Sequence, residues 1–167
     1  KRHFNPLQWV VPQILPEGLS MLVAPPKAGK SWMVAGIGIA CASGSLAFGK
    51  IKVDSRPVLY LALEDGWRRL QGRIRQLNPS AQQPKKLDLI IDAASQVDVE
   101  LKISAWLERH QAEGGLIVLD TLGRIKPAKA PGQDSYSADY AVGVRLKAAI
   151  NQSPGASLLV VHHTRKQ

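Results

Sequence analysis

Residues 24–31, with the sequence APPKAGKS, match the phosphate-binding pattern G-x-x-x-x-G-K-[ST] except at the first position, where Ala24 stands in place of glycine. In such loops backbone N–H groups surround a phosphate at a helix N-terminus, the lysine reaches the β- and γ-phosphate oxygens, and the final hydroxyl binds Mg²⁺. The predicted phosphate contacts are Pro26, Lys27, Ala28, Gly29, Lys30 and Ser31, and Ser31 is also a predicted metal ligand. A chance Gly-Lys-Ser turn is the alternative, which the apolar run before it and the helical pattern after it disfavour.

Two carboxylates come at the ends of apolar runs and could act on a bound nucleotide. Asp120 follows LIVL at 116–119, and it is predicted to hold Mg²⁺ through the water shell of the metal. Glu64 follows PVLYLAL at 57–63, and it is predicted to orient or deprotonate an attacking water. Asp65 is assigned to the cap of the next helix or to a supporting position. The alternative for each carboxylate is a helix cap or a turn.

Paired histidines, His162 and His163, come directly after the apolar run 157–161. One of them is predicted to contact the γ-phosphate and to report its hydrolysis. Adjacent residues of a strand point to opposite faces, and no cysteine or acidic cluster accompanies the pair, so a two-histidine metal site is not expected. A buried core role for one of the two histidines is the alternative.

The elements that must position these residues alternate along the chain. Short apolar runs predict five strands, at 18–24, 57–63, 87–91, 116–119 and 157–161. Helical spacing predicts helices at about 29–43, 65–77, 101–110 and 134–151. Trp32, Trp67 and Trp106 lie in these helices and are expected to be core anchors. Unbroken apolar strands separated by helices are typical of an α/β fold with a parallel sheet covered on both faces, whose strand ends line a ligand crevice.

Composition limits the class of protein. The chain has 167 residues, of which 45% are hydrophobic and 21% charged, which suits one globular domain over residues 1–167 and excludes a disordered, collagenous or coiled-coil chain. Cys41 is the single cysteine, so no internal disulfide can form and a cytoplasmic setting is expected. The uncharged stretch 31–49 is interpreted as a buried helix and a turn rather than a membrane span. The first residue is not methionine, so we expect the segment to come from a longer protein.

Basic residues gather in two places, and the net charge of +9 suits a polyanionic partner such as nucleic acid. The Pro- and Gly-rich segment 121–133 carries three candidate contacts to single-stranded DNA, namely Arg124, Lys126 and Lys129. A solvated loop is an equally good interpretation, since no aromatic residue follows Arg124 in this segment to stack on bases. The predicted helix 65–77 carries Arg68, Arg69, Arg73 and Arg75, for which a solvated or subunit-facing surface is expected.

The motifs PPKAGKS, LALEDG, LIVLDT, DSYSADY and VVHHTRK occur in this order along nearly the whole chain, with Arg73 nine residues beyond Glu64. In this respect the chain resembles the RepA-like branch of the RecA-type P-loop ATPases, which are hexameric helicases of plasmid and phage replication. The resemblance implies a RecA-like core in which the last strand lies between the phosphate-loop strand and the strand that ends at Asp120. It also implies ATP bound at an interface between subunits of a homo-oligomeric ring.

The same resemblance implies roles for individual residues. Lys30 and Ser31 would bind phosphate and Mg²⁺, Glu64 would be the catalytic glutamate, and Asp120 would be the Walker B residue. His162 or His163 would sense the γ-phosphate, and Arg73 would contact the nucleotide. The implied function is Mg²⁺-dependent ATP hydrolysis that drives DNA unwinding or translocation. A regulatory ATPase that acts on a protein partner, and an assembly module that uses ATP only at an interface, are the alternatives.

Overall fold

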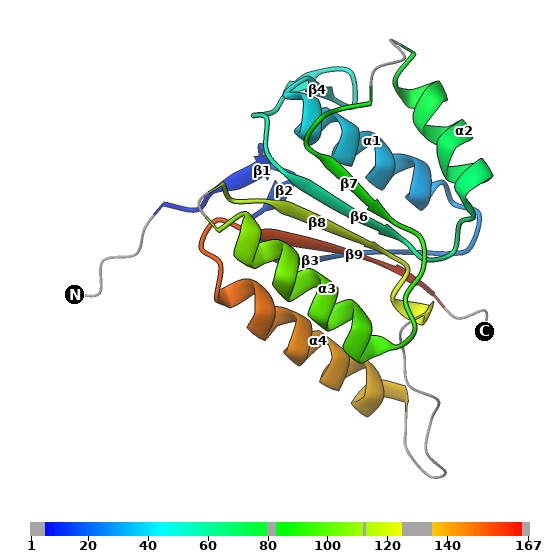
Figure 1. Ribbon diagram of the computed structural model, residues 1–167, viewed down its shortest axis with the longest axis vertical. Coiled ribbons are helices and arrows are strands. Elements are labelled where there is room, and N and C mark those ends of the chain that lie inside the picture. The colour runs from blue at the N-terminus through cyan, green and yellow to red at the C-terminus, as the bar shows by residue number, and fades with distance from the viewer. Residues whose placement is uncertain (1–5, 80–82, 112, 125–134, 165–167) are drawn as a thin grey trace.

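Figure 1 shows the computed structural model as a sheet with helices on both sides. The structure describes residues 6–79, 83–111, 113–124 and 135–164, and the side chains of Leu122 and of residues 135–142 lie outside this description. The strands are β1 Trp9–Val11, β2 Leu15–Pro16, β3 Gly18–Ala24, β4 Leu46–Ala47, β5 Ile51–Lys52, β6 Val58–Ala62, β7 Leu87–Ile90, β8 Leu116–Asp120 and β9 Ser157–His163. The helices are α1 Lys30–Ser43, α2 Trp67–Leu77, α3 Gln96–Arg109 and α4 Ser135–Asn151, with a short 3-10 turn, η1, at Leu122–Arg124.

Five strands form one sheet in the order β3-β9-β8-β6-β7, and all neighbouring strands are parallel. β9 is last in the chain, yet it lies between β3 and β8, so that Val161 is paired with Leu22 on one side and with Asp120 on the other. The expected α/β fold with a RecA-like strand order is therefore confirmed. Because the strands are parallel, the residues at their carboxyl ends meet at one edge of the sheet.

Two hydrophobic cores lie on the two faces of this sheet. In Figure 1, α1 and α2 cover one face and α3 and α4 cover the other. Tyr60 and Val118 belong to the first core, whereas their neighbours Leu59 and Ile117 belong to the second. Side chains of a strand alternate between faces, so a strand with helices on both sides must be apolar at every position. This explains why the central strands could be predicted as unbroken apolar runs.

Glycines in the left-handed conformation mark both ends of α1. Gly29 precedes the helix with φ 84°, and Gly44 ends it with φ 63° while its N–H donates to the carbonyl of Ala40. The stretch 31–49 is therefore mostly α1, followed by the start of the β4–β5 hairpin. Over the described ranges, no helix combines the length and the apolar character needed to cross a bilayer.

The structure differs from the predicted elements in three places. α3 begins at Gln96, earlier than predicted, because Ser95 caps it by accepting a hydrogen bond from the N–H of Asp98 at 3.2 Å. The two short hairpins, β1–β2 and β4–β5, were not predicted. Their strands have only two or three residues, which is too short for hydrophobic alternation to show.

Only one of the three helical tryptophans is a core anchor. Trp106 is 1% exposed, and its indole N–H donates to Asp88 Oδ2 at 2.7 Å. Trp32 and Trp67 are 42% and 57% exposed, so the prediction was wrong for both. Each lies in the first turn of its helix, and neither is among the buried residues of that helix.

Candidate active site

The phosphate-binding loop connects the end of β3 to the start of α1. Within residues 24–31, positive φ angles occur at Lys27 (65°) and Gly29 (84°) and at no other position. Ala24 therefore does not need the conformational freedom of glycine, and the loop closes with alanine at its first position. The first turn of α1 directs its unpaired N–H groups toward this loop, which is the arrangement that binds anions.

Lys30 is folded back onto the loop that precedes it. The residue is 5% exposed, and its ammonium donates to the carbonyl oxygens of Ala24 at 2.7 Å and Pro25 at 2.6 Å. These contacts satisfy two of the three donors of the ammonium. The lysine is thus held beside the N-terminus of α1, with one N–H left for a phosphate oxygen.

Asp120 is a buried carboxylate at the end of β8. The hydroxyl of Tyr60 donates to its Oδ2 at 2.9 Å, and the hydroxyl of Ser31 is also hydrogen-bonded to the carboxyl. Burial raises the pKa of Asp120 above its ordinary value, although both hydroxyls act in the opposite direction. Oδ1 is buried and has no hydrogen-bond partner within the described residues. An unpaired buried carboxylate oxygen next to a serine hydroxyl fits a hard cation such as Mg²⁺.

Glu64 lies two residues beyond the end of β6, and both of its carboxylate oxygens have partners. The hydroxyl of Thr121 donates to Oε1 at 2.8 Å, and His163 Nε2 lies 3.3 Å from Oε2. Partial burial alone would raise the pKa of Glu64, but the hydrogen bonds from Thr121 and His163, together with the charges of His163 and Arg124, lower it overall. Glu64 is therefore ionised at neutral pH and oriented by its neighbours.

The two histidines differ in position. His163 is paired in the sheet with Ala24, where the phosphate-binding loop begins, and it contacts Glu64. His162 precedes it on β9, so its side chain points to the opposite face of the strand. The geometry therefore favours His163 as the histidine of the crevice, a choice that the sequence left open.

Arg73 was predicted to lie on a solvated or subunit-facing surface of its helix, but it is buried, because it forms an ion pair with Asp65. The two side chains are 8% and 7% exposed, and the Arg73 guanidinium lies 5.5 Å from the centroid of the Trp32 ring. Burial would lower the pKa of Arg73, but its hydrogen bond to Asp65 and nearby negative charges raise it. Asp65 does not cap α2, since the cap position is Gly66. Its supporting position, predicted as the other possibility, is what the structure describes.

The predicted DNA contacts are only partly described. Arg124 ends η1, is exposed, and lies close enough to Glu64 to lower the pKa of that carboxyl. Lys126 and Lys129 lie outside the described residues. The loop that was predicted over 121–133 is therefore described only as far as residue 124.

Two residues of the site, Thr121 and Tyr60, were not predicted from the sequence. Thr121 is fully buried and follows Asp120 through a cis peptide bond. Its position directly after a predicted metal ligand was a usable signal. Tyr60 lies within an apolar strand, where an aromatic residue is interpreted as core, and nothing in the sequence indicates that its hydroxyl reaches Asp120.

This fold and this arrangement of a phosphate-binding loop, a buried strand-end aspartate and a nearby glutamate define a P-loop ATPase. A family model described as an AAA domain matches residues 1–167, so the chain belongs to that family. No curated protein matches the sequence.

Two solved structures share the fold. One, described as an ATPase domain, superposes with a TM-score of 0.67 at 11% identity, covering 90% of this chain and 58% of that one. Another, described as a DnaB-like replicative helicase with its interactions with primase, superposes with a TM-score of 0.66 at 11% identity, covering 90% of this chain and 39% of that one. The present chain thus spans less than two thirds of either structure. The comparisons therefore confirm the predicted fold, and the family match agrees with the predicted class of P-loop ATPase.

Proposed function

We propose that this chain is a Mg²⁺-dependent ATPase domain that drives movement along single-stranded DNA within a homo-oligomeric ring. The observation that carries the ATPase part is the meeting of Lys30, Ser31, Glu64, Asp120 and His163 at one edge of the sheet. In the sequence these residues are spread over more than a hundred positions, and the parallel strand order gathers them.

In the proposed reaction, a water molecule held by Glu64 attacks the γ-phosphorus in line, Glu64 accepts its proton, and ADP leaves. The lowered pKa of Glu64 keeps it in the form that accepts a hydrogen bond from this water. Lys30 and the N–H groups of residues 26–31 stabilise the negative charge on the phosphate oxygens. His163, which contacts Glu64, is the residue that senses whether a γ-phosphate is bound.

Ser31 and Asp120 are the residues that hold Mg²⁺ in this proposal. The unpaired Oδ1 of Asp120 and the adjacent Ser31 hydroxyl support the assignment. When bound, the metal supplies positive charge to the phosphate oxygens. Arg73 forms a buried ion pair with Asp65, the neighbour of Glu64, so we propose that it positions the end of β6 instead of contacting the nucleotide itself.

Coupling to DNA is supported by the charge of the chain and by its fold. The net charge of +9, the exposed Arg124 near Glu64, and a fold shared with a replicative helicase favour a nucleic-acid partner. This chain covers only 58% and 39% of the two solved structures, so we propose DNA unwinding and ring formation and do not infer them from those structures.

The test is the steady-state ATPase rate with Mg²⁺, with and without single-stranded DNA at two salt concentrations, together with the mass in solution. Lys30→Ala is expected to abolish phosphate binding, and Glu64→Gln is expected to keep ATP binding while losing turnover. Turnover at the parent rate in either variant contradicts the site assignment. A rate that DNA does not change, in a protein that hydrolyses ATP, contradicts the DNA-driven motor and favours a regulatory ATPase.

A further inference from the structure

A hollow that the proposed reaction does not use lies beside α2. It has a volume of about 620 Å³ and lies between α2 and β7, which is the last strand at its edge of the sheet. We call it the α2–β7 groove and define it by Trp67, Arg68, Leu70, Ile74, Arg75 and Leu89. No residue of the phosphate-binding loop lines it, and neither do Glu64, Asp120 or His163. The groove is therefore separate from the proposed nucleotide site.

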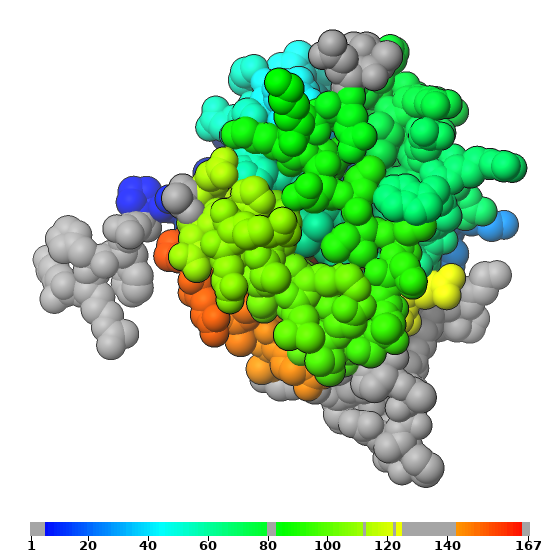
Figure 2. Space-filling model, in the orientation of Figure 1, coloured from blue at the N-terminus to red at the C-terminus, as the bar shows by residue number. Residues whose placement is uncertain are grey.

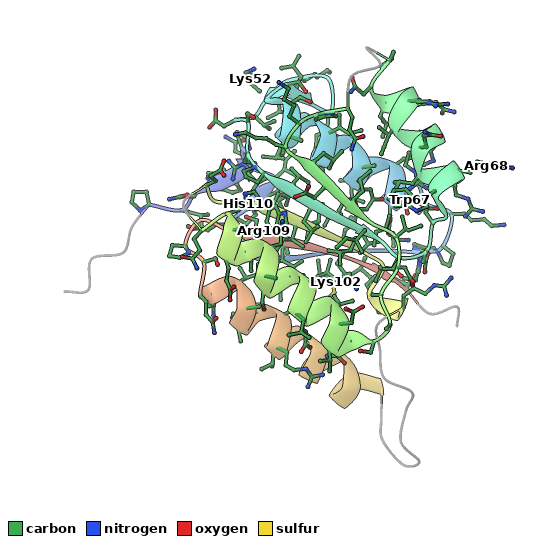
Figure 3. The ribbon with its side chains drawn as sticks, in the orientation of Figure 1. Lys52, Trp67, Arg68, Lys102, Arg109 and His110 are labelled. Carbon is green, nitrogen blue, oxygen red and sulfur yellow. The ribbon has the colours of Figure 1, made fainter. Side chains whose placement is uncertain are left out.

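The groove offers apolar surface that the fold leaves partly uncovered. Leu70 is fully buried beneath it, whereas Ile74 and Leu89 are only half-buried. Trp67 stands at its mouth with 57% of its surface exposed. In Figure 3, Trp67 lies on the side of α2 nearer the sheet, while Arg68 projects outward from the same turn. α2 and β7 both contribute to the face shown in Figure 2, where no other described element covers α2.

Arg68 and Arg75 give the rim of the groove a positive charge. Arg69 and Arg73, on the same helix, both contact Asp65. Arg68 and Arg75 are exposed and form no ion pair with any described residue. α2 itself contains no acidic residue, and none lines the groove. The groove therefore combines an apolar floor with two guanidinium groups that no described residue pairs. Arginine and tryptophan, both present at this groove, are among the residue types that contribute most to binding energy at protein interfaces.

The spacing of these groups suits a helix. Arg68 and Arg75 are seven residues apart, which is two helical turns or about 10 Å along the axis. Trp67, Leu70 and Ile74 follow the spacing i, i+3, i+7. Leu70 and Ile74 pack in the core of this protein, which leaves the exposed parts of Trp67 and Ile74 for an incoming helix. Carboxylates seven residues apart on an incoming helix would match the two arginines when its own apolar stripe enters the hollow.

We propose that the α2–β7 groove is a docking site for an acidic amphipathic helix of a partner protein. The apolar side chains of that helix fill the hollow against Trp67, Ile74 and Leu89, and its carboxylates pair with Arg68 and Arg75. Single-stranded nucleic acid fits less well, because the floor is aliphatic and concave and offers one exposed ring instead of a row of stacking platforms.

The experiment starts from the protein itself. A display library of random 18-residue peptides is selected against the ATPase domain, and the enriched peptides are synthesised with a fluorescent label. We expect sequences with leucine, phenylalanine or tryptophan at helical spacing and glutamate or aspartate on the flank. Binding should shift the emission of Trp67 to shorter wavelength, and the Trp67→Phe variant, which keeps the other three tryptophans, should lack this shift.

Two matched double variants locate the site. Arg68→Glu with Arg75→Glu is expected to weaken binding of the selected peptide at least tenfold. Arg109→Glu with Lys147→Glu makes the same change of charge on α3 and α4, where both residues are exposed, and is expected to change binding less than twofold. Urea unfolding midpoints of the two double variants confirm that both are folded.

Three results would overturn the proposal. The first is a selection that enriches no peptide sensitive to the Arg68 and Arg75 reversal. The second is enrichment of groove-dependent peptides that carry no acidic residues. The third is groove-dependent binding of oligodeoxythymidylate in the absence of such peptides, which would assign the groove to nucleic acid. Because ATP turnover is measured separately, failure here leaves the proposed hydrolysis intact, and the reverse also holds.

Discussion

Thr121 donates its hydroxyl hydrogen to Glu64 at 2.8 Å and so ties the end of β8 to the end of β6. The two residues are 57 positions apart in the sequence. Thr121 directly follows Asp120, so this hydrogen bond adds a side-chain link to the backbone hydrogen bond from the N–H of Leu63 to the carbonyl of Asp120, which joins the same two strand ends. The relationship gives Thr121 a positioning role that can be tested apart from its packing.

Replacing Thr121 by valine removes the hydroxyl and keeps the shape of the side chain. Without this hydrogen bond, the pKa of Glu64 should rise, because the bond stabilises the ionised form. We expect the acid limb of the kcat–pH profile to move to higher pH and kcat at neutral pH to fall about tenfold, which corresponds to about 1.4 kcal/mol. Thr121→Ser, which retains the hydroxyl, should restore the parent profile. A purely structural role would lower kcat without moving the acid limb.

Asp120 should make the unliganded protein less stable as the pH rises. Its folded-state pKa is raised by burial, so between the ordinary value, about 3.9, and the raised value the folded state binds more protons than the unfolded state. Stability from this residue is thus fully present below the ordinary pKa and is lost as the pH rises through the folded pKa. Asp120→Asn should remove this loss and unfold at a higher urea concentration than the parent at neutral pH without nucleotide.

The parent protein and Asp120→Asn also test the proposed metal site when Mg²⁺ and a non-hydrolysable ATP analogue are added. The parent should gain stability from the ligands, and Asp120→Asn should gain much less, because its amide is a poor ligand for the metal. Equal gains in the two proteins would contradict the proposed metal role of Asp120.

The ion pair between Arg73 and Asp65 should be costly to break from one side. Asp65→Asn leaves the buried guanidinium of Arg73 without its counter-charge, and we expect a loss of about 3 kcal/mol in the free energy of unfolding by urea. Arg69→Ala removes the other partner of Asp65, but that side chain is 74% exposed, so its loss should be below about 0.5 kcal/mol. Similar losses in the two variants would show that burial does not distinguish the two arginines.

Gly115 is fitted against the ring of Trp106. A Cβ at this position would lie 2.5 Å from Cη2 and 2.7 Å from Cζ3 of that ring, so Gly115→Ala should destabilise the protein by about 1–3 kcal/mol. Gly72 lies within α2, and a Cβ there would meet nothing within 4 Å. Gly72→Ala should therefore raise stability by about 0.5–1 kcal/mol through helix propensity. Thermal unfolding of the two alanine variants provides the comparison.

Much of the fold follows from local sequence. β3 extends over Gly18–Ala24, as predicted, because a glycine precedes the apolar run and two prolines follow it. The spacing of Ser95 and Asp98 is that of a helix cap, and it could have predicted the start of α3. The polar residues around them hid the helical spacing of the apolar residues, so the predicted helix began too late. The short hairpins depend on contacts such as the hydrogen bond from the Glu17 N–H to the Gln8 carbonyl, which no local pattern predicts.

The site was predictable in its residue types and less so in its contacts. Lys30, Ser31, Glu64 and Asp120 lie where strand ends and motif spacing placed them. The contact between His163 and Glu64 joins residues 99 positions apart and depends on β9 entering the sheet beside β8. The exposure of Trp32 was missed because a helical aromatic residue was taken to face the sheet, whereas its ring faces Arg73.

The contacts of Lys30 determine at which step its side chain loses conformational entropy. A lysine side chain that becomes fixed loses roughly 2 kcal/mol of conformational entropy. Here the ammonium is already anchored to two carbonyls of the loop, so that loss occurs when the chain folds. The rotamer of Lys30 is therefore fixed before a nucleotide binds. The free energy of nucleotide binding does not include the entropic cost of ordering this side chain.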